Sequence, residues 1–148
     1  MEATTMSEQN KISEQTLIEE VWNRGNFAIV DQLVSPDFRG HSASPETDTR
    51  GTDGYRAYYQ ALRAAFPDMH FAIEDQIAEG DKVVTRWTAR GTHQGDYAGI
   101  PATGRAGVII GVTTDRIADG KVVECWTSLD ELGLLQQLGV IPRPGQAA

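Results

Sequence analysis

The spacing of apolar residues predicts helices in the first half of the chain and strands in the second half. Apolar residues first take helical spacing over 17–22, after Ser13, which can cap a helix. Asn26 can cap a second, shorter helix, and Pro36 ends it. The first helices are therefore expected to form a closely connected pair.

A third helix is predicted after a polar loop, and its apolar face is unusually aromatic. The apolar residues follow the helical period, which places them along one side of the helix. They are Tyr55, Tyr58, Tyr59, Leu62 and Phe66. Pro67 ends this helix.

From Met69 onward the apolar period changes to two, which predicts strands. Alternating segments cover 69–78 and 82–93, and a long loop separates them from 105–118 and 121–129. The last two flank Asp119-Gly120, a dipeptide typical of a tight hairpin turn. Three helices followed by a meander of strands predict an α+β fold, in which a curved antiparallel sheet wraps around three N-terminal helices.

Length and composition indicate one soluble domain. The chain has 148 residues, which we divide into a disordered tail (1–11), a single domain (12–140) and a C-terminal tail (141–148). A net charge of -8 argues against nucleic-acid and anionic-membrane partners. We expect a cytoplasmic location, because no apolar segment reads as a secretory signal or a membrane span and Cys125 is the single cysteine.

Five short motifs occur in a fixed order along the chain. They are Phe66-Pro67-Asp68, GTHQG (91–95), GIPATG (99–104), RIADGKVVE (116–124) and LLQQLG (134–139). Together they resemble the SnoaL-like polyketide cyclase (ester cyclase) family of the nuclear transport factor 2-like superfamily. The resemblance spans about 13–139. It implies a cone-shaped pocket lined by apolar residues, a dimer or tetramer, and chemistry without a cofactor.

The resemblance also implies positions for catalytic residues. Members that close polyketide rings by an aldol step use an aspartate on the last strand, a histidine on the preceding strand and an asparagine near the first strand. By motif register these positions fall on Thr127, Thr113 and Gly40, so all three depart from the family pattern. His41 adjoins the last position and substitutes for it if the register shifts by one residue.

Which face of the strand over 105–118 points toward the helices decides which residues line the pocket. One face carries glycines, Thr113 and Asp115, and the other carries Val108, Ile110 and Val112. Apolar character alone favours the second face as core. We choose the first, because it includes the family's histidine position and because glycines opposite a helix layer leave room for a ligand. The second face then becomes the interface of a homodimer or tetramer.

Three residues are predicted to carry catalysis: Asp115, His41 and Thr127. An apolar cavity disfavours the charged form of Asp115 and suits it to proton transfer, although a place near the hairpin end also allows a solvated role. His41 has a side chain that titrates near neutral pH and is expected at the pocket mouth or on the surface. Asp75 is a weaker candidate on an inward face.

Aromatic and small polar residues are predicted to bind the substrate, with core packing as the alternative for many of them. The predicted substrate-binding residues are Trp22, Phe38, Tyr55, Tyr59, Phe66, Trp87, Thr113 and Cys125. The three histidines have no ligand-like spacing, so neither a metal nor a cofactor is expected. His93 is expected to bond to the loop backbone, and His70 to lie in solvent.

These observations predict an enzyme that acts without a cofactor on a hydrophobic, carbonyl-bearing small molecule. The predicted reaction is proton abstraction beside the carbonyl, followed by cyclisation or isomerisation. A ligand-binding module without activity is one alternative, because threonines occupy the family's acid and helper positions. An oxygenase of an aromatic polyketide that needs no cofactor is another.

Overall fold

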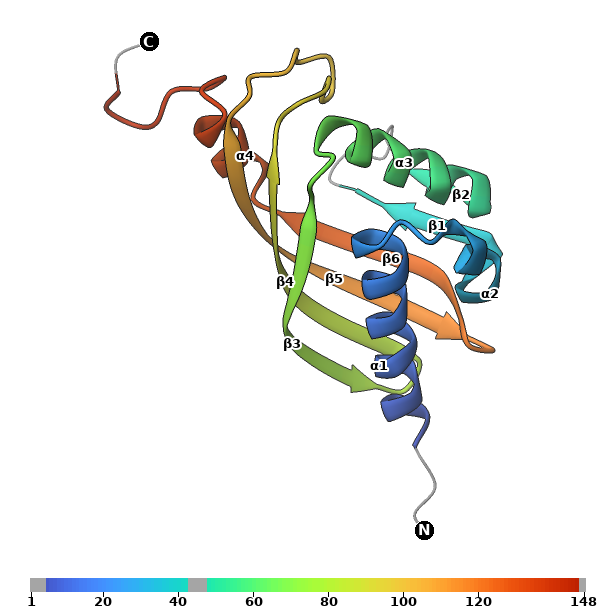
Figure 1. Ribbon diagram of the computed structural model, residues 1–148. Helices are drawn as coiled ribbons and strands as arrows, with labels where there is room; N and C mark the ends of the chain where they lie inside the picture. Colours follow the sequence, from blue (N-terminus) through green and yellow to red (C-terminus); the bar gives the residue numbers. More distant parts are fainter. Residues whose placement is uncertain (1–4, 43–47, 147–148) are drawn as a thin grey trace.

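Helices pack against the concave face of a curved six-stranded sheet, and the two termini lie at opposite ends of the molecule (Figure 1). The computed structural model describes residues 5–42 and 48–146. The strands are β1 (Val34–His41), β2 (Thr49–Arg50), β3 (His70–Glu79), β4 (Lys82–Thr92), β5 (Ala106–Ala118) and β6 (Lys121–Leu129). The helices are α1 (Met6–Thr16), η1 (Leu17–Asn23), η2 (Phe27–Ile29), α2 (Val30–Leu33), α3 (Gly51–Ala65) and α4 (Glu131–Gln137). The α+β class is as predicted.

The first helix begins at Met6, and its cap, Thr5, lies eight residues before the predicted cap, Ser13. Thr5 caps it, because its hydroxyl accepts from the amide of Glu8 at 3.1 Å while the Glu8 carboxylate accepts from the Thr5 amide at 3.0 Å. This reciprocal capping box satisfies two amides that a helix start leaves without partners. Residues 6–11, assigned to a disordered tail from their polarity, therefore belong to α1.

Helix α1 continues without a break into η1, which has the wider turns of a π-helix. Asn23 fastens the end of η1 to β3, since its side chain bonds to both the carbonyl and the amide of Phe71, at 3.0 and 2.7 Å. As predicted, Asn26 then caps the short helix η2, by accepting from the amide of Ala28. The α1–η1 segment is thus held along the concave side of the sheet.

The strand order is β2-β1-β6-β5-β4-β3. Neighbouring strands are antiparallel except β1 and β6, which are parallel. The predicted antiparallel sheet thus contains one parallel pair that the sequence did not predict, because β1 and β6 are distant in sequence and no hairpin sets their direction. The β5–β6 hairpin is as predicted, with both Asp119 (φ 52°) and Gly120 (φ 76°) in the left-handed region that the tight turn requires.

Two β-bulges change which residues face the helices. In β3 the register shifts between Ile73 and Asp75, so Asp75 is exposed and its predicted inward position is wrong. In β6 a strict alternation predicts Val123 on the inner face with Cys125 and Thr127. The pairing shifts beside Ile117, so Val122 is buried in the core instead. A bulge inserts one residue and reverses the alternation beyond it, which a strict period of two does not reproduce.

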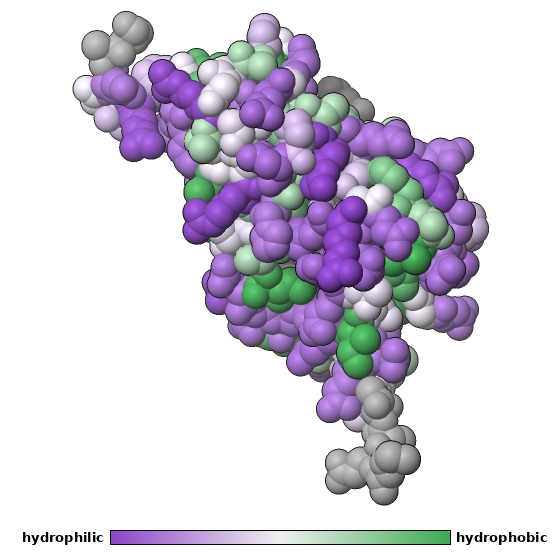
Figure 2. All heavy atoms as spheres, viewed as in Figure 1, coloured by the Kyte–Doolittle hydropathy of each residue, from purple (hydrophilic) through white to green (hydrophobic). Residues whose placement is uncertain are grey.

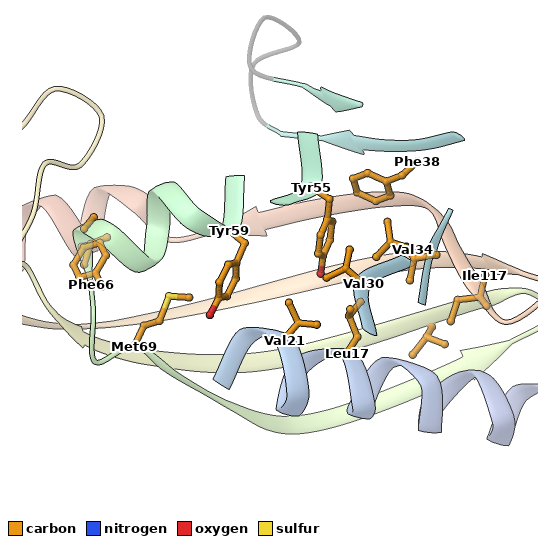
Figure 3. Packing of buried hydrophobic residues seen from close by; sticks show 14 of the residues in the cluster. Leu17, Val21, Val30, Val34, Phe38, Tyr55, Tyr59, Phe66, Met69 and Ile117 are labelled. Carbon is orange, nitrogen blue, oxygen red and sulfur yellow. The ribbon is translucent and has the colours of Figure 1, made fainter. Parts of the chain in front are cut away.

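The core lies between α3, the α1–η1 segment and the sheet. Figure 3 shows Tyr55 and Tyr59 extending from α3 toward Leu17 and Val21 of the first helices. Edge-to-face ring contacts join Trp22 to both tyrosines, with ring centroids 6.0 and 5.2 Å apart. The aromatic face predicted for the third helix therefore forms the centre of the molecule.

The surface on the viewed face is largely hydrophilic, with apolar residues in small separate areas (Figure 2). In the part of the chain that the structure describes, no helix is long and apolar enough to span a membrane.

Candidate functional site

A cavity of about 200 Å³ lies between the first helices, α3 and the concave face of the sheet. Most of its wall is apolar, with Leu17, Phe38, Phe66 and Val122 among the buried residues that line it. Ser42, Tyr58 and Arg90 are the exposed residues along the described wall.

Two carboxyl groups meet in the buried part of this cavity. Glu14 comes from the last turn of α1 and Asp115 from the inner face of β5, and each is only 3% exposed. Their side chains are in hydrogen-bonding contact, which requires that one of them carries a proton. One oxygen of each, Oε2 of Glu14 and Oδ1 of Asp115, has no hydrogen-bond partner among the described residues. We call Glu14 and Asp115 the carboxyl pair.

The surroundings of the carboxyl pair favour neutral over charged forms. Burial and the neighbouring Asp115 carboxylate raise the pKa of Glu14 well above its ordinary value. Burial also raises the pKa of Asp115, and hydrogen bonds from Glu14 and Cys125 partly offset that rise. Glu14 is therefore the member that retains its proton, and Asp115 is the member that ionises first.

Hydroxyl and thiol groups extend the polar part of the cavity wall. The indole Nε1–H of Trp87 donates to the hydroxyl of Thr113 at 2.9 Å, which leaves the threonine O–H free to donate. Cys125 lies 3.4 Å from the hydroxyl of Thr127. Burial, followed by the charge of Asp115, raises the pKa of the Cys125 thiol well above its ordinary value, so Cys125 is a neutral group and a poor nucleophile.

Tyr55 contributes a phenol to the same cavity. The indole Nε1–H of Trp22 donates to the Tyr55 hydroxyl at 2.6 Å, so the phenolic O–H stays available to a ligand. Burial raises the pKa of Tyr55 well above its usual range. Tyr55 is thus a fixed hydrogen-bond donor near neutral pH.

The glycines of β5 provide only part of the ligand space that we predicted. A Cβ atom on Gly111 would collide with the Trp87 ring, and one on Gly107 would lie 2.7 Å from Leu134. Gly111 therefore makes room for Trp87, whereas Gly107 makes room for α4 and also lines the cavity. The choice of inner face holds nonetheless, because Thr113 and Asp115 line the cavity whereas Ile110 is 61% exposed on the opposite face.

His41 borders the cavity at the end of β1, but its ring does not face the carboxyl pair. The ring stacks on Trp126 at 5.4 Å between centroids, and its Nε2 lies 2.7 Å from a Glu124 oxygen. Glu124 pairs with Arg116, which is on the face of β5 opposite Asp115. His41 therefore lies on the outer face of the sheet, separate from Asp115.

Most of the other predicted substrate-binding residues line the cavity. These are Trp22, Phe38, Tyr55, Phe66, Trp87, Thr113 and Cys125, and Thr127, predicted as catalytic, also lines the cavity. Tyr59 is the exception, because it is almost fully buried against Trp22 and Phe27 and does not belong to the cavity wall. His93 is buried, and its Nδ1 accepts from the Thr103 amide at 3.2 Å, in keeping with the predicted structural role.

Glu14 is the site residue that sequence reasoning missed. It occupies the same helical face as Leu17, Ile18 and Val21, at spacings of three, four and seven, so its burial follows from the pattern. A charged residue on an apolar helix face was the available signal. The prediction placed the helix cap at Ser13 and followed only the apolar residues of this face, so it assigned no role to Glu14. Asn10, one turn earlier on α1, is also buried.

The described residues contain no group of three or more His, Cys, Asp or Glu side chains arranged to hold a metal ion. The polar groups of the cavity wall include the carboxyl pair, the hydroxyls of Tyr55, Thr113 and Thr127, and the thiol of Cys125. Together these groups can move protons and donate hydrogen bonds.

The fold and the site define an α+β protein whose curved sheet and helices enclose a small, mostly apolar cavity with a buried acid/base group. Residues 13–138 match the SnoaL-like polyketide cyclase family. The chain belongs to that family, as its motifs predicted.

Individual relatives show the same relationship. The chain is 29% identical over 122 residues to aklanonic acid methyl ester cyclase DnrD from Streptomyces peucetius, covering 81% of this chain and 84% of the relative. A proposed SnoaL-like polyketide cyclase from Jannaschia sp. CCS1 superimposes with a TM-score of 0.86 at 25% identity, over 96% of this chain and 99% of that one. IdmH from Streptomyces antibioticus, a proposed polyketide cyclase, is 34% identical with a TM-score of 0.77, over 89% and 99% of the two chains.

Proposed function

We propose that the protein catalyses acid/base cyclisation or isomerisation of a hydrophobic, carbonyl-bearing small molecule of polyketide type, without a cofactor. The observation that carries this proposal is the buried Asp115 carboxyl, which faces a largely apolar cavity. A carboxylate in such a place is poorly solvated and gains from accepting a proton. Asp115 is therefore the base that removes a proton from the carbon beside the substrate carbonyl.

The carbonyl oxygen becomes negative as that proton leaves, and the site has donors to stabilise it. Tyr55 and Thr113 each accept a hydrogen bond from a tryptophan and keep their own O–H free. Donors held in place before the reaction stabilise the enolate more than mobile water does. Thr127, on the adjacent strand, supplies a third hydroxyl along the same wall.

The size and charge of the cavity support a compact, neutral substrate. Its volume of about 200 Å³ is below the ~300–1,000 Å³ of pockets that enclose drug-sized ligands. The enclosed part therefore suits one or two rings, with any remainder at the opening. Buried carboxyls repel an anionic ligand, and the similarity to a cyclase named for a methyl ester agrees with a neutral substrate.

The test uses β-tetralone, a two-ring ketone, and follows deuterium uptake from solvent at the carbon beside its carbonyl. The wild type is expected to accelerate this exchange, and Asp115→Asn to reduce the enzymatic rate by ~10²-fold or more, the range of general base catalysis. Asp75→Asn is the matched control, since Asp75 is exposed on β3. Ring closure of aklanonic acid methyl ester, followed by chromatography, is a second readout. Equal rates for the wild type and Asp115→Asn in both assays would contradict the proposal.

A ligand-binding module without activity is the second candidate. It is supported by Thr113 and Thr127 at the positions where ring-closing relatives are expected to have a histidine and an aspartate. Tight binding of β-tetralone without exchange would favour this candidate. Oxygen consumption with an aromatic polyketide substrate would instead favour the oxygenase alternative.

We also propose that the protein forms a homodimer through the outer face of the sheet. Val108, Ile110 and Val112 lie along this face of β5, and Trp126 lies on the neighbouring strand β6. All four are large apolar residues with at least 37% of their surface exposed. A contiguous apolar patch of this kind is typical of an interface.

A further inference from the structure

The carboxyl pair joins groups from opposite sides of the cavity. Glu14 is on α1, Asp115 is on β5, and both are buried and in hydrogen-bonding contact. Two carboxylates in direct contact repel each other strongly in a poorly solvated site. If both groups were protonated, the site would have no base. The arrangement is most stable with a single proton between the two groups.

Among the residues that the structure describes, no cation neutralises the pair. In the described part of the chain, the titratable groups that interact with it are the Cys125 thiol on β6 and the Tyr55 phenol on α3, both held neutral by burial. His41 and Arg90 also border the cavity. His41 bonds on the outer face of the sheet, and Arg90 follows the inward-facing Ala89, so its side chain lies on that outer face as well.

Each member of the pair also has an oxygen that can reach a ligand. Glu14 Oε2 and Asp115 Oδ1 lack hydrogen-bond partners among the described residues, and both residues line the cavity. Buried polar atoms are rarely left unpaired unless a ligand or water completes them. The free oxygens therefore indicate that both residues, rather than Asp115 alone, contact the substrate.

We propose that Glu14 and Asp115 share one proton and act as a single acid/base unit, in which Asp115 accepts the proton from substrate carbon and Glu14 protonates the carbonyl oxygen. This proposal rests on the proposed function. It assigns Glu14 as a second catalytic residue, and it places the acid/base group on α1 and β5 instead of on the family's positions at Thr127 and Thr113.

The proton transfers balance without a further reactant. Asp115 takes the carbon-bound proton, and the C–H electron pair forms the C=C bond of the enol. The carbonyl π electron pair moves to the oxygen at the same time, and this oxygen receives the proton of Glu14. In a ring closure the enol carbon then attacks a second carbonyl. The enol O–H proton returns to Glu14, and the proton on Asp115 passes to the new alkoxide. The carboxyl pair ends in its starting state.

The direct test is a carboxyl-carbon NMR titration of the free protein, with labelled aspartate and glutamate. We expect two separated steps that involve both residues, because the second ionisation places two negative charges together. Glu14→Gln and Asp115→Asn should each abolish the upper step, and the remaining carboxyl should then titrate at a lower pH. Glu74→Gln and Asp75→Asn, at exposed positions of β3, should leave both steps unchanged. If each residue titrates identically with and without its partner, the shared proton is excluded.

Deuterium exchange into β-tetralone distinguishes an error in this proposal from an error in the proposed function. If the pair acts as a unit, Glu14→Gln should lower the maximal exchange rate by ~10²-fold, in the range of general acid catalysis, with little change in the Michaelis constant. Loss of exchange in Asp115→Asn with full activity in Glu14→Gln would overturn the role of Glu14 and keep Asp115 as base. Full activity in both variants would overturn the proposed function itself.

Discussion

At the scale of single residues, the most consequential feature is a glutamate on the apolar face of the first helix. Glu14 loses its hydration on folding and receives a second carboxyl, Asp115, as its neighbour. Both effects favour its protonated form in the native state, so folding is linked to pH through this residue. A glutamine at position 14 has the same shape as the protonated glutamate. It carries no charge, so no charge loses its hydration on folding.

Replacing Glu14 by glutamine should therefore change how stability depends on pH. The native pKa of Glu14 is raised above its unfolded value, so its favourable contribution is complete below the ordinary glutamate pKa and is lost as pH rises toward the native pKa. We expect Glu14→Gln to be increasingly more stable than the wild type with rising pH across this range. The gain should approach about 1.4 kcal/mol for each unit by which the pKa is raised.

Urea unfolding at a series of pH values measures this effect, with Glu74→Gln as the exposed control. The control should follow the wild type at every pH. A constant difference between Glu14→Gln and the wild type over the whole series would show that Glu14 has an ordinary pKa in the native protein.

Residue patterns predicted much of the cavity wall and one member of the carboxyl pair. The inner face of β5 was chosen correctly, so Asp115 and Thr113 were found. Glu14 was missed because only the apolar residues of the first helix were used to identify its buried face. Tyr55 and Tyr59 occupy adjacent turns of one aromatic face, but only Tyr55 lines the cavity, because Tyr59 is almost fully buried against Trp22 and Phe27.

At the scale of helices and strands, short-range signals determined which boundaries could be predicted. Asp119-Gly120 correctly located the β5–β6 turn, because both residues adopt positive φ values. The bulges in β3 and β6 have no such local signal, so Asp75 and Val123 were assigned to the wrong face. The parallel pairing of β1 with β6 depends on contacts between distant parts of the chain.

The start of α1 provides a test at this scale. Thr5→Ala removes the hydroxyl that accepts from the Glu8 amide and should destabilise the protein by about 1 kcal/mol, the usual cost of losing a cap. Thr5→Ser keeps the hydroxyl and should stay close to the wild type. Thermal unfolding monitored by circular dichroism compares the two. Equal destabilisation by both variants would mean that the cap does not contribute to the stability of α1.

At the scale of the whole molecule, the two faces of the sheet have different roles. The concave face packs against the helices and encloses the cavity, while the outer face carries Val108, Ile110, Val112 and Trp126 in contact with solvent. The family and the fold were predictable because ordered motifs extend over most of the chain, and residues 13–138 match the family. The candidate site was less predictable, because it combines side chains from α1 and β5 that meet only in the folded protein.

The proposed homodimer leads to a prediction about this outer face. Ile110→Glu places a charge at the centre of the apolar stripe and should convert the dimer to a monomer, because burying an unpaired carboxylate is strongly unfavourable. Ile12→Glu, at an exposed position of α1, is the control and should remain dimeric. Light scattering after size exclusion gives the masses. A monomeric wild type would contradict the proposed interface.

The central claim is that the carboxyl pair acts on the oxygen and the adjacent carbon of a carbonyl compound. β-Naphthol is a planar analogue of the enol that β-tetralone would form, so a crystal structure of its complex tests the claim most directly. We predict that the ring occupies the cavity beside Trp22 and Phe38, with its hydroxyl in hydrogen-bonding contact with Glu14 and its neighbouring ring carbon against Asp115. A hydroxyl that points to the opening, away from both carboxyls, would contradict the account.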